Sequence, residues 1–355
     1  MLFTPFQLGR VELANRIVMS PMTRSRAPGN VPNGQMARYY ALRATAGLIV
    51  TEGTAPSLHG LGYARIPGVF SADQVAGWRL VTDAVHAAGG RIFIQLMHTG
   101  RVGHAANLPA GGRVLAPSAI AAPGQIHTDS LGMQPYPAPA EMTVDEIRTA
   151  ISEFAHAARS AIVAGADGVE LHGANGYLIE QFLNTAANQR TDAFGGSVGN
   201  RIRFAVEVAE AVAGAIGRDR VGIRISPHGV AGGMVADAET NAVYLALAQE
   251  LQRIGVVYIH VADHAGLGAP PVPRALMSGL RERYAGAVIL SGGYDRARAE
   301  ADLESHLGDL VAFGRPFLAN PNLVAKLRAN RDLIPADPRT FFTPGNEGYL
   351  DWPVD

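Results

Sequence analysis

The strongest constraint on how this chain folds is an alternation, repeated along its length, between short apolar segments and segments of helical periodicity. Apolar runs of roughly four to eight residues, rich in β-branched side chains, are typical of buried strands, and apolar residues at helical spacing indicate amphipathic helices. Eight strands are predicted, at 17–22, 48–51, 92–96, 168–171, 221–225, 257–261, 288–290 and 310–313. The clearest intervening helices are predicted at 73–88, 144–164, 200–215, 241–253 and 297–306.

Strands that alternate with helices pair in parallel through right-handed crossovers. Thr143 and Glu146 support the pattern, because together they form a capping box at the start of the helix predicted at 144–164. The length of 355 residues fits either two average domains or one large barrel. Eight strand–helix units favour an α/β fold, a single (β/α)8 TIM barrel that spans residues 1–355 as one domain.

Two segments lie outside this alternation. The residues before position 17 are predicted to form a hairpin that closes the floor of the barrel. Residues 101–142, after the third strand, are rich in proline, glycine and alanine and are too many for an ordinary strand–helix loop. We expect this insertion to form a lid or small hairpin over the mouth of the barrel.

Composition excludes several kinds of function. The formal net charge is −1 and no long basic run occurs, so nucleic acid is not an expected partner. No apolar run approaches the length of a membrane span, and the start of the chain lacks the features of a signal peptide, so we expect a cytoplasmic enzyme without a membrane partner. The absence of cysteine excludes disulfides, thiolate nucleophiles and iron–sulfur clusters. Only one lysine, Lys326, could supply Schiff-base chemistry.

The fourth predicted strand leads into the segment richest in candidate chemistry. This strand runs into His172, the chain turns past Asn175, and a helix begins at Tyr177. Two neutral hydrogen-bond donors and one phenolic proton therefore gather at the carboxyl end of a barrel strand, where barrel enzymes place their chemistry. Such a cluster could bind an oxygen of a substrate and deliver a proton to a neighbouring atom.

The last two strands indicate a phosphate site. Gly292 and Gly293 follow the seventh strand, and Gly314 and Arg315 follow the eighth. Glycines let backbone N–H groups approach a phosphate closely, and an arginine supplies the opposite charge. Arg224, on the fifth strand, either forms a salt bridge with a distant carboxylate or faces a ring system that becomes anionic.

A series of motifs, in order along almost the whole chain, resembles the old yellow enzyme family of FMN-dependent ene-reductases. The resemblance is strongest to the bacterial branch that includes N-ethylmaleimide reductase. The motifs are Pro21-Met22-Thr23-Arg24, Gln95-Leu96-Met97-His98-Thr99-Gly100-Arg101, His172-Gly173-Ala174-Asn175-Gly176-Tyr177, Asn188-Gln189-Arg190-Thr191-Asp192, Gly195-Gly196-Ser197 and Ala312-Phe313-Gly314-Arg315.

The resemblance implies a role for each matching residue. Thr23 would hydrogen-bond the flavin carbonyl beside N5, Gln95 would hold the pyrimidine edge, and Arg224 would lie near N1. His172 and Asn175 would bind the activating oxygen of the substrate, and Tyr177 would donate the proton. The other residues implied to bind FMN contribute backbone contacts near the ring or hold the phosphate: Pro21, Met22, Gly53, Gly292, Gly293, Gly314 and Arg315.

The implied reaction is the reduction of activated C=C bonds with NAD(P)H as electron donor. A hydride would pass from flavin N5 to the β-carbon of an enone, enal, maleimide or nitroalkene, and the α-carbon would be protonated; nitrate esters are a further candidate substrate. Met97 stands where many relatives have tryptophan and should widen the substrate pocket. Tyr63 and Tyr349 resemble aromatic residues of the pocket wall, although packing or lid positions would explain them equally well.

Other interpretations compete with this one. His260, Asp263 and His264 could ligate a metal, but no carboxylate cluster completes such a site, so we expect no metal and ordinary surface or loop histidines. A barrel lyase or isomerase would also use a phosphate site, yet no lysine or carboxylate base is evident at the strand ends. A flavin-binding sensor without catalysis is the third alternative. The protein is expected to be a monomer or a homodimer.

Overall fold

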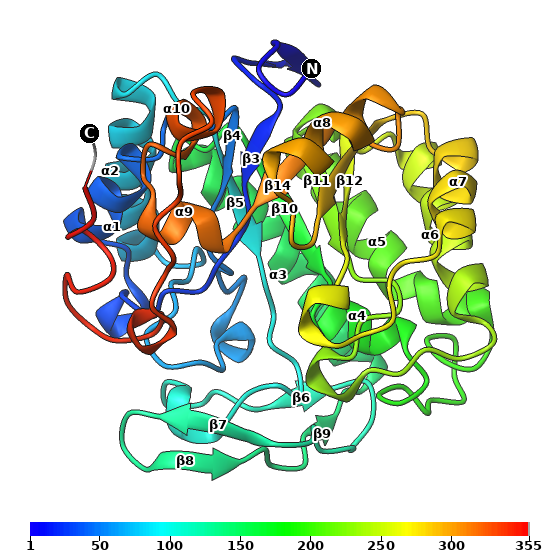
Figure 1. Ribbon diagram of the computed structural model, residues 1–355. Helices are drawn as coiled ribbons and strands as arrows, with labels where there is room; N and C mark the ends of the chain where they lie inside the picture. The colour runs from blue at the N-terminus through cyan, green and yellow to red at the C-terminus, as the bar shows by residue number, and fades with distance from the viewer. Residues whose placement is uncertain (354–355) are drawn as a thin grey trace.

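The computed structural model describes residues 1–353, and its centre is a closed barrel of eight parallel strands. The strands follow one another around the barrel in chain order, with the last pairing against the first (Figure 1). The prediction of a (β/α)8 barrel is therefore confirmed. The barrel strands are β3 (Ile17–Met19), β4 (Leu48–Val50), β5 (Ile92–Leu96), β10 (Gly168–Gly173), β11 (Val221–Ile225), β12 (Tyr258–Ala262), β13 (Ala287–Ser291) and β14 (Leu310–Phe313).

Helices surround the barrel and connect successive strands (Figure 1). The α-helices are α1 (Gly34–Ala41), α2 (Ala72–Ala87), α3 (Val144–Val163), α4 (Leu178–Leu183), α5 (Val198–Ile216), α6 (Thr240–Ile254), α7 (Arg274–Arg283), α8 (Arg296–Glu304), α9 (Arg315–Ala319) and α10 (Leu323–Arg328). The capping box expected at the start of α3 is present, because Thr143 Oγ1 accepts from the backbone of Glu146 and Glu146 accepts from the backbone of Thr143. Single 3-10 turns lie at Pro28–Asn30, Leu58–Gly60, Ala105–Asn107, Arg218–Arg220, Ala231–Gly233, Ala265–Leu267 and Pro338–Thr340.

The barrel strands differ from the predicted ranges mainly at their carboxyl ends. The first strand was predicted at 17–22 but β3 ends at Met19, so Ser20 to Thr23 leave the sheet. Pro21 has no N–H to donate to a neighbouring strand, which accounts for the early end. In contrast, β10 extends two residues beyond the predicted 168–171, because His172 and Gly173 pair with Arg224 and Ile225 on β11.

Two apolar regions hold these layers together. One lies between the strands and the surrounding helices and includes the fully buried side chains of Trp78, Phe154 and Phe204. The other fills the amino-terminal end of the barrel, where the hairpin of β1 (Phe6–Leu8) and β2 (Val11–Leu13) covers it. The floor hairpin predicted from the residues before position 17 is therefore confirmed.

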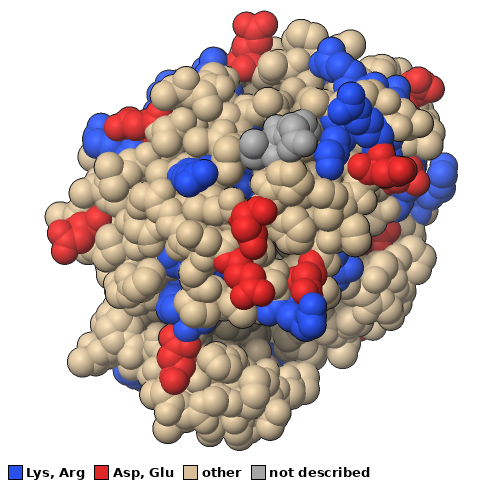
Figure 2. All heavy atoms as spheres, turned by 60° about the vertical axis from the view of Figure 1, so that its left-hand side comes forward, with Lys and Arg blue, Asp and Glu red and all other residues tan. Residues whose placement is uncertain are grey.

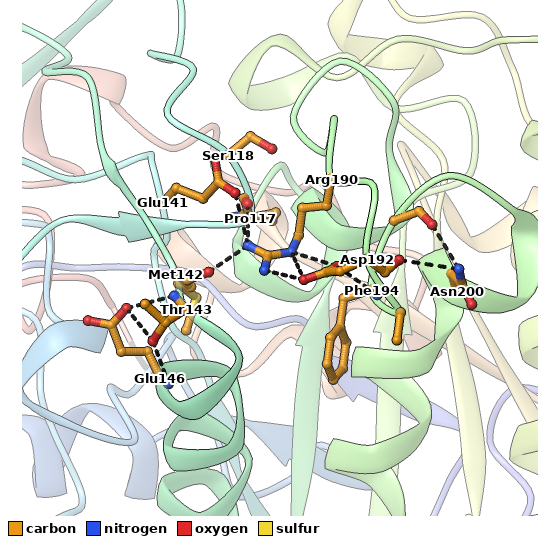
Figure 3. A network of polar contacts seen from close by, with 12 residues as sticks. Pro117, Ser118, Glu141, Met142, Thr143, Glu146, Arg190, Asp192, Phe194 and Asn200 are labelled. Carbon is orange, nitrogen blue, oxygen red and sulfur yellow. Dashed lines mark hydrogen bonds and ion pairs between the residues drawn. The ribbon is translucent and has the colours of Figure 1, made fainter.

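The insertion after β5 forms the predicted lid at the opposite end of the barrel. At its tip, β7 (Gln125–Thr128) and β8 (Gly132–Pro135) make an antiparallel hairpin, and at its base β6 (Leu115–Ala116) pairs with β9 (Ala140–Glu141). Arg190, which follows α4, binds the base from inside the fold, as its guanidinium donates to Pro117 O at 2.9 Å and to Met142 O at 2.6 Å (Figure 3). Both base strands of the lid are thus fixed to one side chain.

Charged residues of both signs are interspersed among uncharged residues on the face of the molecule that Figure 2 shows. This mixture agrees with the formal net charge of −1. Across residues 1–353, every helix is too short or too polar to cross a lipid bilayer.

Candidate active site

A cavity of about 850 Å³ opens at the carboxyl ends of the barrel strands, beneath the lid. Its volume lies within the range of roughly 300–1,000 Å³ that is usual for small-molecule and cofactor sites. Strand ends, lid and carboxyl-terminal segment all contribute to its wall. The predicted site residues that line it are Pro21, Met22, Thr23, Gly53, Tyr63, Gln95, Met97, His172, Asn175, Tyr177 and Arg315.

The three predicted catalytic residues come together at the end of β10. The rings of His172 and Tyr177 lie edge to face with centroids 4.8 Å apart, and the hydroxyl of Tyr177 donates to that of Tyr63 at 3.2 Å. Between them the backbone makes a tight turn, with φ of 60° at Asn175 and 78° at Gly176. A side chain at position 176 would also collide with Ala231 O, which a Cβ would approach to 2.4 Å. Only glycine fits this part of the turn.

Burial sets the protonation states of this cluster. It lowers the pKa of His172 well below its ordinary value, and the positive charge of Arg224 lowers this pKa further. It raises the pKa of Tyr177, although the hydrogen bond with Tyr63 opposes the increase. At neutral pH the imidazole is therefore uncharged, with one N–H to donate, and the phenol keeps its proton.

Arg224 is the main positive charge beside these residues. It lies on β11 in register with His172 on β10 and His260 on β12. Its side chain is almost fully buried, and its Nε has no hydrogen-bond partner among the described residues. No ion pair to it occurs in residues 1–353, so the salt bridge considered from the sequence is not formed. A buried guanidinium in this state favours a ligand that accepts hydrogen bonds or carries negative charge.

The interior of the barrel beneath Arg224 contains a network of hydrogen bonds that was not predicted from the sequence. Glu170 accepts from Gln95 at 2.7 Å and from Tyr258 at 3.1 Å, and its other contact is His260 Nδ1 at 2.8 Å. Burial alone would raise the pKa of Glu170, but His260, Arg224 and Gln95 outweigh it and lower that pKa. Glu170 therefore stays ionised, balances Arg224 and orients the Gln95 amide. Because alternate residues of a barrel strand face inward, Glu170 could have been identified from its place two residues before His172.

The predicted phosphate-binding residues lie at the ends of two adjacent strands. Gly292 and Gly293 follow β13, and Gly314 and Arg315 follow β14, which pairs with it. Arg315 is exposed on the cavity wall and pairs with no carboxylate of residues 1–353. Gly292, Gly293 and Gly314 are not among the residues that line the cavity.

Two expectations from the sequence need correction. Tyr349 is not part of the cavity wall: it is fully buried, and its ring stacks on Tyr39 with centroids 4.0 Å apart. Arg24 and Arg26 bind the backbone of the carboxyl-terminal segment, at Gly348 and Glu347, and this fixes Tyr349 in the core.

His260, expected as a surface or loop histidine, is instead buried on strand β12, whereas His264 lies in the loop after β12, as expected, and is buried there. Among residues 1–353, no group of three or more His, Cys, Asp or Glu side chains is placed to hold a metal ion. His260 is explained by its hydrogen bond to Glu170 inside the barrel.

The residues at the strand ends fit a flavin nucleotide. His172 Nδ1 and Arg224 Nε are buried polar atoms without a partner in residues 1–353, and such atoms usually indicate a polar ligand. Thr23 and Gln95 offer further polar groups on the same cavity, and Arg315 offers a positive charge beside the paired glycine turns. A planar ring held between the strand ends, with a phosphate at β13 and β14, would use all of these groups.

Comparison with known proteins agrees with this fit. The profile of the NADH:flavin oxidoreductase / NADH oxidase family matches residues 1–333. A probable flavin mononucleotide-dependent alkene reductase from Leishmania infantum is 42% identical over 354 residues, covering 98% of this chain and 96% of the relative. 12-Oxophytodienoate reductase 7 from Oryza sativa subsp. japonica is 39% identical over 376 residues, covering 99% of this chain and 94% of the relative.

Solved structures show the same likeness. Morphinone reductase superposes with a TM-score of 0.96 at 43% identity, covering 99% of this chain and 96% of that one. A structure of morphinone reductase in complex with tetrahydroNAD gives a TM-score of 0.94 at the same identity, covering 99% of this chain and 97% of that one. The old yellow enzyme homologue from Zymomonas mobilis gives 0.95 at 38% identity, with 99% of both chains covered. The chain therefore belongs to the NADH:flavin oxidoreductase / NADH oxidase family, the old yellow enzyme family of FMN-dependent oxidoreductases.

Proposed function

We propose that this protein reduces activated C=C bonds, using FMN as cofactor and NADH or NADPH as electron donor. The observation that carries the proposal is the convergence of His172, Asn175 and Tyr177 on one cavity with Thr23 and Gln95. When bound there, FMN would accept a hydride from the nicotinamide and transfer it to the substrate. The structure of morphinone reductase with tetrahydroNAD supports a nicotinamide as the reductant.

His172 and Asn175 would bind the carbonyl or nitro oxygen that activates the alkene. A neutral imidazole donates one hydrogen bond and a primary amide donates two, so the pair can hold an oxygen that gains negative charge. Because the pKa of His172 is lowered by burial, the donor stays uncharged and does not protonate the oxygen itself. The pair therefore polarises the alkene and stabilises the enolate or nitronate that follows.

Tyr177 would deliver the proton to the α-carbon. Its hydroxyl lies in the same cavity, and burial keeps its pKa above the ordinary value, so the proton is present at neutral pH. Tyr63 contacts the same hydroxyl at 3.2 Å and would keep it oriented between transfers. The substrate then leaves with one hydride and one proton added across the double bond.

On the cofactor side, Gln95, Arg224 and Arg315 would make the main polar contacts. Gln95 is oriented by Glu170, the Nε of Arg224 has no hydrogen-bond partner within residues 1–353, and Arg315 lies beside the glycine turns after β13 and β14. Thr23 would contact the ring near its reactive nitrogen. Met97 is buried on the cavity wall with its sulfur over Gly53, where a Cβ would approach it to 2.3 Å. We propose that this flexible side chain admits enones, enals, maleimides and nitroalkenes, and that nitrate esters are accepted as a further class.

The experiment is an anaerobic titration of the purified protein. We expect a yellow protein that releases FMN on denaturation, that NADPH or NADH bleaches, and that 2-cyclohexenone restores to yellow. A colourless protein that cannot be reconstituted with FMN would refute the flavoenzyme. Bleaching without return of colour with any activated alkene or nitrate ester would refute the reductase and leave a flavin-binding sensor.

A further inference from the structure

The turn that carries Asn175 and Tyr177 is held by a buried carboxylate with no catalytic role so far. Glu180 lies in the first turn of α4, the short helix that follows β10, and only 2% of its surface is exposed. Its Oε2 accepts from the backbone N–H of Gly176 at 2.5 Å. Its Oε1 accepts from Ser226 at 2.7 Å and from Tyr244 at 2.9 Å. One side chain thus joins the turn to the end of β11 and to α6.

Ser226 extends the same network to the substrate-binding amide. The backbone N–H of Asn175 donates to Ser226 Oγ at 2.9 Å, so both N–H groups of the turn are linked to Glu180, one directly and one through the hydroxyl. The neighbouring Gln181 holds the other side of the turn, donating to Gly176 O at 2.7 Å. Asn175 and Gly176 both have positive φ, a conformation that needs such external support at a residue with a side chain.

The chemistry of Glu180 argues against a purely structural role. In residues 1–353 it has no ion-pair partner, and all three of its donors are neutral. A buried carboxylate in this setting costs stability, and a glutamine could make the same contacts by accepting from Gly176 and donating to the two hydroxyls. Retention of a carboxyl group, which can accept all three of these hydrogen bonds, is more easily explained by the support that it gives to the turn.

We propose that Glu180 is a positioning residue for the reaction, fixing the Asn175–Gly176 turn so that the amide of Asn175 and the phenol of Tyr177 face the substrate together with His172. The inference rests on the proposed function of these three residues. It predicts that loss of the carboxylate disturbs oxygen binding and proton delivery more than it disturbs FMN binding.

The test compares Glu180→Ala, Glu180→Gln and a control, Glu304→Ala, in the FMN-bound protein. Glu304 ends α8 on the exposed surface, away from the cavity. Each protein is first reduced with dithionite, so that nicotinamide binding does not affect the measured rate. It is then mixed with 2-cyclohexenone in a single turnover. Binding of 4-chlorophenol, an enolate mimic, is followed by the flavin spectrum, and hydrogen exchange is measured at the amides of residues 174–177.

For Glu180→Ala we expect about tenfold weaker phenol binding, about tenfold slower reoxidation and faster exchange in the turn, with FMN content within twofold of the unmodified protein. Glu180→Gln should restore phenol binding to within about threefold, and Glu304→Ala should change nothing. Phenol binding and reoxidation within twofold in Glu180→Ala would overturn the proposal. A structural role alone would lower stability but leave exchange at residues 174–177 and phenol binding unchanged in the folded fraction.

A second variant covers the case in which Glu180→Ala does not fold. Ser226→Ala removes the link to Asn175 but leaves Glu180 in place, and we expect about threefold weaker phenol binding; an unchanged affinity would overturn the proposal. If the unmodified reduced protein is not reoxidised by 2-cyclohexenone, the proposed function fails instead. Phenol affinity and amide exchange in the variants then still decide the role of Glu180.

Discussion

At the scale of single residues, the site separates two tasks between side chains only a few positions apart. His172 and Asn175 can donate hydrogen bonds without losing a proton, whereas Tyr177 has a proton to lose and a hydroxyl neighbour, Tyr63, at 3.2 Å. This division predicts which substitutions affect which half of a catalytic cycle. It also predicts that the hydroxyls of Tyr177 and Tyr63, although they lie on the same cavity, contribute unequally to the rate of reoxidation.

Tyr177→Phe should therefore slow reoxidation by 2-cyclohexenone by roughly a hundredfold or more, the usual effect of losing a general acid. Reduction by NADPH or NADH should change little, because no proton from Tyr177 is needed there. The ring and its edge-to-face contact with His172 remain in the variant, so binding is preserved. Stopped-flow measurement of the two half-reactions checks this. Tyr63→Phe is the matched control, with an expected effect below tenfold; equal slowing of both half-reactions in Tyr177→Phe would remove Tyr177 from the proton-donor role.

At the scale of secondary-structure elements, much of the architecture could be predicted from periodicity. The ranges of β5, β11 and β14 were predicted to the residue, and the five clearest helices were located to within a few positions. The helices α1 and α7 were not delimited, since both are short, with eight and ten residues. The end of β10 depended on pairing with β11, some fifty residues later in the chain, which local pattern does not contain.

The site was predictable to the same extent. Residues at strand ends, such as His172 and Gln95, were found because a parallel barrel brings these ends together. Glu180 was missed because its partners Ser226 and Tyr244 are distant in sequence and meet it only in the folded barrel. Tyr349 was placed on the pocket wall by resemblance, but the stacking on Tyr39 that buries it is a tertiary contact.

The lid gives a prediction at the same scale. Arg190 donates to Pro117 O and Met142 O, which follow the two base strands of the lid, and forms an ion pair with Asp192 (Figure 3). Arg190→Ala should release the base strands β6 and β9, because two backbone carbonyls lose a buried charged donor. We expect faster hydrogen exchange across residues 115–142 and a higher KM for the alkene, with barrel strands still protected.

The control for the lid is Arg203→Ala. Arg203 is exposed on α5 and donates to Ala193 O and Asn200, without a contact to the lid. Like Arg190→Ala, this substitution removes one positive charge close to the same loop, but it breaks only two hydrogen bonds, to Ala193 O and Asn200 Oδ1. If both variants show the same exchange across residues 115–142, Arg190 does not control the lid.

At the scale of the whole molecule, buried carboxyl groups and buried histidines make opposite contributions to the free energy of unfolding as pH changes. Burial raises the pKa of Glu52 and of Glu180 to about 7, so the folded protein binds these protons more tightly than the unfolded chain does. Their contribution to the free energy of unfolding grows as pH falls from about 8 toward 5. Burial has the opposite effect on His98 and His264, whose pKa values fall to about 3 and about 4. Their contribution is present above pH 6.5 and is lost as pH falls toward 4.

Together, these contributions predict that the free energy of unfolding has a broad maximum near neutral pH and falls gradually below about pH 6. His172 and His260 also have lowered pKa values, so the histidines outnumber the two carboxyl groups and dominate on the acid side. The carboxyl groups make this loss shallower than the histidines alone would. A variant that removes one of the two carboxyl groups should therefore lose stability more steeply as pH falls.

Glu52→Gln isolates this effect, because Glu52 lies behind the cavity wall, where it accepts from Tyr40 at 3.2 Å and from the backbone N–H of Arg24 at 3.3 Å. Each pKa unit between folded and unfolded states is worth about 1.36 kcal/mol, so the raised pKa of Glu52 corresponds to about 3 kcal/mol at most. Between pH 8 and pH 5, the stability of the unmodified protein relative to Glu52→Gln should rise by about 2–3 kcal/mol. Urea unfolding at both pH values, with FMN in excess, measures the difference. A difference that stays constant with pH would show that Glu52 does not take up a proton on folding.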